Sequence, residues 1–260
     1  MDSIYWQLEK DATITDYPSF DKISLTILGW GIIGVLSEII IRRTHLSLSA
    51  ADTLANIRHI IIFLGIPLLY QTKNKIKLFP FFVSSLLIII SVSLLHDTRA
   101  PLILLLLLLF IPVYKLQWNL RSIIIGLVTG IIFGLHLYFV SSLSQFFTPK
   151  PLEQLSAYDV LFELTIGVIA LEYFFRKFIF QQLITHKWSP INASTVTTIF
   201  YTLLFLANPR FTSSVALTTG ILFYALLVSI IFCWLTLKEK SIVPTIVASF
   251  IIALVRLLII

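Results

Sequence analysis

Long uninterrupted apolar runs are the feature that most constrains how this chain can fold. Phe81–Leu95 and Leu102–Phe110 contain no charged residue, and the runs are continuous rather than alternating, which is typical of membrane helices and not of barrel strands. Across 260 residues, 58% are hydrophobic and 12% are charged, with a mean hydropathy of +0.96. Because a soluble domain carries about 25% charged residues, this chain lacks the charge to cover a soluble surface. The sequence therefore predicts an all-α, polytopic transmembrane helical bundle.

The apolar segments predict eight or nine transmembrane spans. The expected segments are Ile23–Ile41, Arg58–Gln71, Leu78–Leu95, Ala100–Tyr114, Ser122–Leu143, Val160–Leu183, Ile191–Asn208, Val215–Leu237 and Ser241–Ile260. The second segment is short for a span of about 20 residues, so it either spans or forms a kinked, re-entrant or interfacial piece. Nine spans place the N-terminus inside and eight place it outside. The Lys and Arg bias does not distinguish them, and the acidic N-terminal tail fits eight spans slightly better. Both counts place the loops after the fourth, sixth and eighth spans in the cytoplasm.

Three regions follow from this division. Residues 1–22 form a polar N-terminal tail, residues 23–159 the N-terminal transmembrane helices and residues 160–260 a C-terminal transmembrane core. The tail is rather acidic and has no apolar centre, so we do not expect a cleaved signal peptide. The net charge of +6 comes from basic residues in short loops between apolar runs, which is the positive-inside pattern. We therefore expect no nucleic-acid partner.

Metal and cofactor sites are not expected. Cys233 is the only cysteine, which excludes a disulfide within the chain and a thiolate–metal cluster. The five histidines show no metal-ligand spacing. We interpret His136, within the fifth span, as a hydrogen-bonded interior group, and Trp118, Tyr138 and Trp188 near span ends as interfacial anchors.

The candidate site begins at two ionisable residues within an apolar segment. Glu172 and Arg176 are four apart, which on an α-helix places them on one face and close enough to pair. Ionisable groups at membrane depth are costly, so they usually pair or face a protein interior. The structural interpretation is an ion pair that ties this helix to its neighbours. The functional alternative is direct catalysis or ligand binding.

Further polar features follow this helix in a distinctive order. They are the loop Thr185–Ala193, an apolar helix ending at Asn208, and a last helix that begins at Ser241-Ile242-Val243-Pro244 and contains Ser249. From Val160 onward this order resembles the CPBP family, also called the Abi or CAAX prenyl protease 2-like family of membrane proteins. Its pattern is two adjacent glutamates and an arginine, then Phe-x-x-x-His, then His-x-x-x-Asn or Asp. The resemblance implies a CPBP-like core in the last four helices.

The chain departs from this pattern at most of its catalytic positions. Glu172 matches the second glutamate and Arg176 the arginine, but Leu171 stands at the first glutamate. The positions of the second and third motifs hold Leu204, Asn208, Ser249 and Ala253. In the family, the first glutamate is thought to activate water, while the histidines and asparagine orient it and stabilise the oxyanion. Leucine cannot accept a proton, and serine or alanine cannot replace imidazole near neutral pH.

These departures predict a pseudoprotease with no assigned catalytic residue, in which Glu172, Arg176, Asn208 and Ser249 are remnants. Such a protein would act as an adaptor, assembly or regulatory subunit of another integral membrane protein. The alternative is an active CPBP-like intramembrane peptidase with a divergent site, using Glu172, Asn208 and His136. A transporter or channel subunit is disfavoured because few polar residues lie in the spans.

The expected partners are the lipid bilayer and another integral membrane protein. Gly126-x-x-x-Gly130-x-x-x-Gly134 predicts close packing against a helix, either of a partner or of the same chain. The prokaryotic plasma membrane is the default location. A thylakoid or organelle membrane is the alternative, because members of the resembling family occur there.

Overall fold

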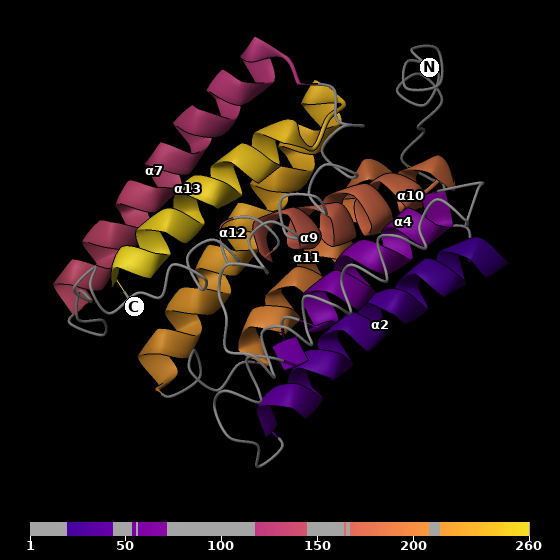
Figure 1. The fold of residues 1–260 in the computed structure, drawn as a ribbon, viewed down its shortest axis with the longest axis horizontal. Coiled ribbons are helices and arrows are strands. Elements are labelled where there is room, and N and C mark those ends of the chain that lie inside the picture. Colours follow the sequence, from indigo (N-terminus) through magenta and orange to yellow (C-terminus); the bar gives the residue numbers. More distant parts are fainter. Residues whose placement is uncertain are drawn as a thin grey trace, which may run out of the picture. The chain divides into compact units, whose positions relative to one another are not determined.

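The structure, a computed structural model, describes residues 20–43, 54–55, 57–71, 118–144, 164, 167–207 and 214–259. Every element within these ranges is helical, which confirms the all-α class (Figure 1). The elements are α2 (Lys22–Arg43), the π-helical η1 (His59–Gly65), α4 (Ile66–Gln71), α7 (Leu120–Ser144), α9 (Val168–Glu172), the π-helical η5 (Tyr173–Phe180), α10 (Gln181–Thr185), α11 (Pro190–Leu206), α12 (Val215–Glu239) and α13 (Val243–Ile259). The third and fourth expected spans, Leu78–Leu95 and Ala100–Tyr114, lie outside the described residues.

Three of the described helices are long and apolar enough to cross a membrane. They are α2, most of α7 (Leu120–Val140) and α12. Shorter apolar helices cover Ile61–Tyr70, Pro190–Leu206 and Val243–Leu257. Many large apolar side chains on α2 and α7 are exposed, as they are on helices that face lipid. The protein is therefore an integral membrane protein in contact with the lipid bilayer.

Polar caps define where several helices begin. The Asn119 carboxamide oxygen accepts a hydrogen bond from the backbone N–H of Ser122 at 2.7 Å, at the start of α7. The Ser189 hydroxyl accepts one from the backbone N–H of Asn192 at 3.2 Å, and Pro190 occupies the first turn of α11. Such caps satisfy backbone donors that have no partner within the helix. They explain why the apolar segments start at these residues.

The chain divides into two compact units. One unit comprises Met1–Ile40 and Phe175–Trp234, and the other comprises Ile41–Phe174 and Leu235–Ile260. Each unit thus combines stretches that are far apart in the sequence. The three regions expected from the sequence, 1–22, 23–159 and 160–260, stay a prediction.

In the unit that contains α7 and α13, these two helices lie side by side along a row of glycines (Figure 1). A Cβ added at Gly126 would lie 2.6 Å from the Pro244 carbonyl oxygen, and one at Gly130 would lie 2.9 Å from the Ala248 Cα. At Gly134 an added Cβ would lie 3.1 Å from a side-chain methyl of Val255. Such backbone proximity requires residues without side chains. The glycine motif therefore packs a helix of the same chain.

In the other unit, aromatic side chains fill the space between helices. Gly31 of α2 faces the ring of Phe200 on α11, where a Cβ would lie 2.5 Å from a ring carbon. Phe175 and Tyr201 meet edge to face, with ring centroids 5.2 Å apart and planes at 82°. Tyr201 also contacts Phe205 at 5.0 Å. These contacts anchor η5 and α11 to each other.

Two residues differ from the positions expected from the sequence. His136 is exposed on α7, not interior, because it lies two positions beyond Gly134 and thus about 200° around the helix from the glycine row that faces α13. Trp188 is 4% exposed and packs within its own unit, so it is not an interfacial anchor. Trp118 and Tyr138 are exposed, as anchors would be.

Candidate functional site

Glu172 and Ser249 meet in the unit that contains α9 and α13. Glu172 ends α9 and is 1% exposed, while Ser249 lies half-buried on α13. The Ser249 hydroxyl donates a hydrogen bond to Glu172 Oε1 at 2.7 Å. α9 packs against both α13 and η1. Two candidate residues that are 77 positions apart are thus brought into direct contact.

The backbone changes from α-helical to π-helical directly after Glu172. The π-helical segment η5 runs over the next eight residues and contains Arg176. Since a π-helix has wider turns than an α-helix, the four-residue spacing between Glu172 and Arg176 does not place their side chains as an α-helix would. Short π-helical stretches inside α-helices occur frequently at functional sites.

Arg176 is held by polar side chains from α12. It is fully buried, and its Nη1 donates to the Ser229 hydroxyl at 3.1 Å and to the Cys233 sulfur at 3.4 Å. The Thr198 hydroxyl on α11 in turn donates to the Ser229 oxygen at 3.0 Å. The guanidinium therefore joins a hydrogen-bonded network that ties η5, α11 and α12 together.

Two aromatic rings complete the surroundings of this guanidinium. The Arg176 Cζ lies 4.9 Å from the ring centroid of Tyr201 and 5.7 Å from that of Phe232. A cation over the face of an aromatic ring is stabilised, and more so where water is excluded. A buried charge with such partners has a structural explanation, because it fixes the positions of several helices.

The comparison with known families supplies the second line of evidence. Residues 153–255 match the family model described as type II CAAX prenyl endopeptidase Rce1-like. This segment is Rce1-like. The match includes Glu172, Arg176, Asn208 and Ser249, and it confirms the resemblance stated from the sequence motifs. Neither the curated proteins nor the solved structures gave a match. Residues 153–255 are thus similar to CAAX protease-like membrane proteins.

Among the described residues, the other positions that the sequence analysis matched to the family pattern hold apolar side chains. Leu171 is half-buried beside Glu172, and Ala253 is buried on α13. Leu204 is buried on α11, and Asn208 lies outside the described residues. Of the matched polar residues, the structure brings Glu172 and Ser249 into contact.

The network around Arg176 was not predicted from the sequence. Ser229 and Cys233 are four apart on an apolar helix, so they share a face, and Thr198 is one of several hydroxyl residues in α11. Recurrent hydroxyl residues within apolar helices were the available signal, because they bond across helices in membranes. Among the described residues, no group of three or more His, Cys, Asp or Glu side chains is arranged to hold a metal ion.

Proposed function

We propose that this protein is a non-catalytic, Rce1-like pseudoprotease that acts as an adaptor, assembly or regulatory subunit of another integral membrane protein. The observation that carries this proposal is the hydrogen bond from the Ser249 hydroxyl to the buried Glu172 carboxylate. A serine occupies the position of a motif histidine and holds the remaining acid. The acid then links α9 to α13 in place of activating water.

The side chains at two other positions of the family pattern support the same proposal. Peptide hydrolysis by a water molecule needs a general base and groups that stabilise the oxyanion. Leu171 and Ala253 supply neither a proton acceptor nor a hydrogen-bond donor from their side chains. Retention of the helical scaffold without these groups favours a role in binding.

The apolar exterior supports a membrane-embedded partner. Exposed apolar side chains lie along α2, α7 and α12, and those that do not face lipid are available to a partner helix. The partner would pack on side chains outside the glycine row of α7, since α13 occupies that row. We assign the protein to a prokaryotic plasma membrane by default, with a thylakoid or organelle membrane as the alternative.

The alternative function is an active peptidase with a divergent site, which the contact between Glu172 and Ser249 also allows to be tested. In that case the carboxylate would have to accept a proton from water or from the hydroxyl. Glu172→Gln removes this basicity but keeps an oxygen that can accept the Ser249 hydrogen bond. The variant therefore tests the basicity of Glu172 without removing the hydrogen bond from Ser249.

The test is purification of the tagged full-length protein from its native membrane in mild detergent, followed by mass spectrometry of co-purifying proteins. We expect a stoichiometric membrane-protein partner that Glu172→Gln retains at wild-type level. Recovery of the wild type without a partner, together with cleavage of a membrane or prenylated peptide that Glu172→Gln abolishes, would establish the peptidase instead.

A further inference from the structure

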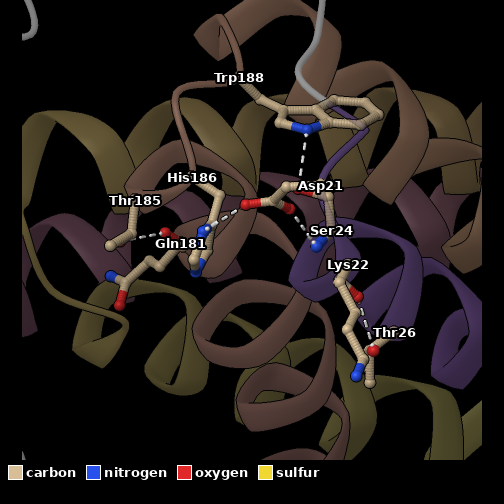
Figure 2. A network of polar contacts seen from close by, with 8 residues as sticks. All are labelled: Asp21, Lys22, Ser24, Thr26, Gln181, Thr185, His186 and Trp188. Carbon is tan, nitrogen blue, oxygen red and sulfur yellow. Dashed lines mark hydrogen bonds and ion pairs between the residues drawn. The ribbon is translucent and has the colours of Figure 1, made fainter.

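Two polar contacts connect the start of α2 to the loop that follows α10 (Figure 2). His186 Nδ1 lies 3.1 Å from Asp21 Oδ2, and Trp188 Nε1 donates to the Ser24 hydroxyl at 3.2 Å. These pairs join residues that are 165 and 164 positions apart. Asp21 and Ser24 lie outside the Rce1-like segment, whereas His186 and Trp188 lie inside it. The contacts thus connect the Rce1-like segment to a helix outside the match.

An unusual backbone conformation presents the two loop residues to α2. Lys187 adopts a φ of 65°, in the left-handed region that glycine usually occupies at the end of a helix. The Lys187 N–H donates to the Ile184 carbonyl at 3.0 Å and the Trp188 N–H to the Leu183 carbonyl at 3.1 Å, which closes the end of α10. The chain therefore turns sharply between His186 and Trp188. Figure 2 shows both side chains directed at the first turn of α2.

The tryptophan half of this connection is buried and carries no titrating group. Trp188 is 4% exposed and Ser24 fully buried. The Trp188 ring also meets Phe20 edge to face, with centroids 5.3 Å apart and planes at 76°. These contacts keep their strength at any pH near neutral, because neither the indole nor the hydroxyl ionises there.

The histidine half reaches water and can exchange protons. The side chains of His186 and Asp21 are 21% and 44% exposed. The backbone N–H of Ser24 donates to Asp21 Oδ1 at 2.6 Å, and this bond, followed by the Ser24 side chain and the charge of His186, lowers the pKa of Asp21 below its usual 3.8. The carboxylate thus stays ionised in mildly acidic solution, and its stabilising effect is lost only as the pH falls through this lowered pKa.

Among the residues that the structure describes, two lysines neighbour this pair in the chain. Lys187 is the chain neighbour of His186, and Lys22 follows Asp21. Figure 2 shows the Lys22 side chain directed away from the imidazole. Histidine is the side-chain type whose charge ordinarily changes between about pH 5 and 8. The contact between His186 and Asp21 is an ion pair only when the imidazole carries a proton.

We propose that Asp21, Ser24, His186 and Trp188 form a proton-dependent latch between α2 and the Rce1-like segment. Protonation of His186 turns its contact with Asp21 into an ion pair and tightens the latch. Loss of the proton weakens the contact between His186 and Asp21. The hydrogen bond from Trp188 to Ser24 still holds the loop against the start of α2. The latch does not depend on whether the protein has peptidase activity.

The test is hydrogen–deuterium exchange of the full-length protein in detergent, followed in peptides that cover residues 20–26 and 183–190. The quantity measured is the ratio of the exchange rate in His186→Gln to that in the wild type at the same pH, which cancels the intrinsic pH dependence. We expect a ratio of about two to five at about pH 5.5, the range for an exposed ion pair, and a ratio near one at about pH 8. Asp21→Asn should give the same pattern.

Two further variants complete the design. Trp188→Phe keeps an aromatic ring but loses the N–H donor, so it should raise exchange by the same factor at both pH values. His136→Gln, at an exposed histidine on α7, should leave both peptides unchanged. A His186→Gln ratio that is equal at the two pH values would overturn the proposal, as would an Asp21→Asn variant that exchanges like the wild type.

Discussion

At the scale of single residues, the two remnant ionisable groups each have a partner on another helix. Glu172 accepts from Ser249 of α13, and Arg176 donates to Ser229 and Cys233 of α12. Buried charges persist only with such compensation, because removing one partner leaves an uncompensated group in an apolar environment. These contacts give both groups a structural role.

Ser249→Ala should therefore destabilise the protein. Loss of the hydroxyl removes a hydrogen bond to a buried carboxylate, and such bonds contribute about 1.5–3 kcal/mol. Thermal unfolding in detergent should show a lower midpoint for Ser249→Ala, while Ser249→Thr, which keeps the hydroxyl, should lie close to the wild type. Equal midpoints for Ser249→Ala and the wild type would show that this hydrogen bond does not stabilise the fold.

At the scale of helices, the contact between α7 and α13 depends on glycine. A side chain at Gly130 meets the backbone of Ala248 as well as the Ile251 side chain, and backbone cannot move aside as the end of a flexible side chain can. Gly29 on α2 is different, because no described neighbouring atom lies within 4 Å of a Cβ built there. The two glycines form a matched pair for testing close helix packing.

Gly130→Leu should lower the free energy of unfolding by about 1–3 kcal/mol or prevent assembly of α7 on α13, because overpacking forces backbone shifts. Gly29→Ala should be neutral or stabilising by up to about 1 kcal/mol, since alanine favours the helix more than glycine does. Thermal unfolding and the yield of monodisperse protein measure both effects. Comparable stabilities of the two variants would contradict the importance of the close contact between α7 and α13 at Gly130.

At the scale of the whole molecule, the latch bears on the number of spans. His186 lies in the loop after the sixth expected span, which both counts place in the cytoplasm. Because Asp21 lies 3.1 Å from His186, we expect the start of α2 to lie on the same side of the membrane as that loop. A cytoplasmic start of α2 agrees with nine spans and not with eight. The segment Arg58–Gln71 would then be a crossing.

Cysteines introduced by Lys22→Cys and Lys187→Cys, both at exposed positions, test this topology. A membrane-impermeant maleimide should label both only when it reaches the cytoplasmic side, as in inverted vesicles. The wild type serves as the background control, because its single cysteine, Cys233, is buried. Labelling of the two positions from opposite sides would contradict the shared location of the latch residues.

Much of the fold follows from local patterns in the chain. The ends of α2, α7 and α12 lie within a few residues of the expected spans, since apolar runs and capping residues such as Asn119 and Ser189 act locally. The glycine row of α7 was recognisable for the same reason, as it repeats on one helix face. The helix that packs on this face, α13, could not be identified from the sequence, because helix pairing depends on contacts between distant segments of the chain.

The sequence by itself determined the class of this protein and the similarity of residues 153–255 to the Rce1-like family. Too little charge to cover a soluble surface follows from composition, and the order of motif residues is a property of the chain alone. Only the tertiary structure decided what the ionisable residues contact. The π-helical turn after Glu172 alters the direction of the following side chains, and the partner Ser249 lies 77 positions away. Such contacts arise from packing between distant segments, which no local spacing encodes.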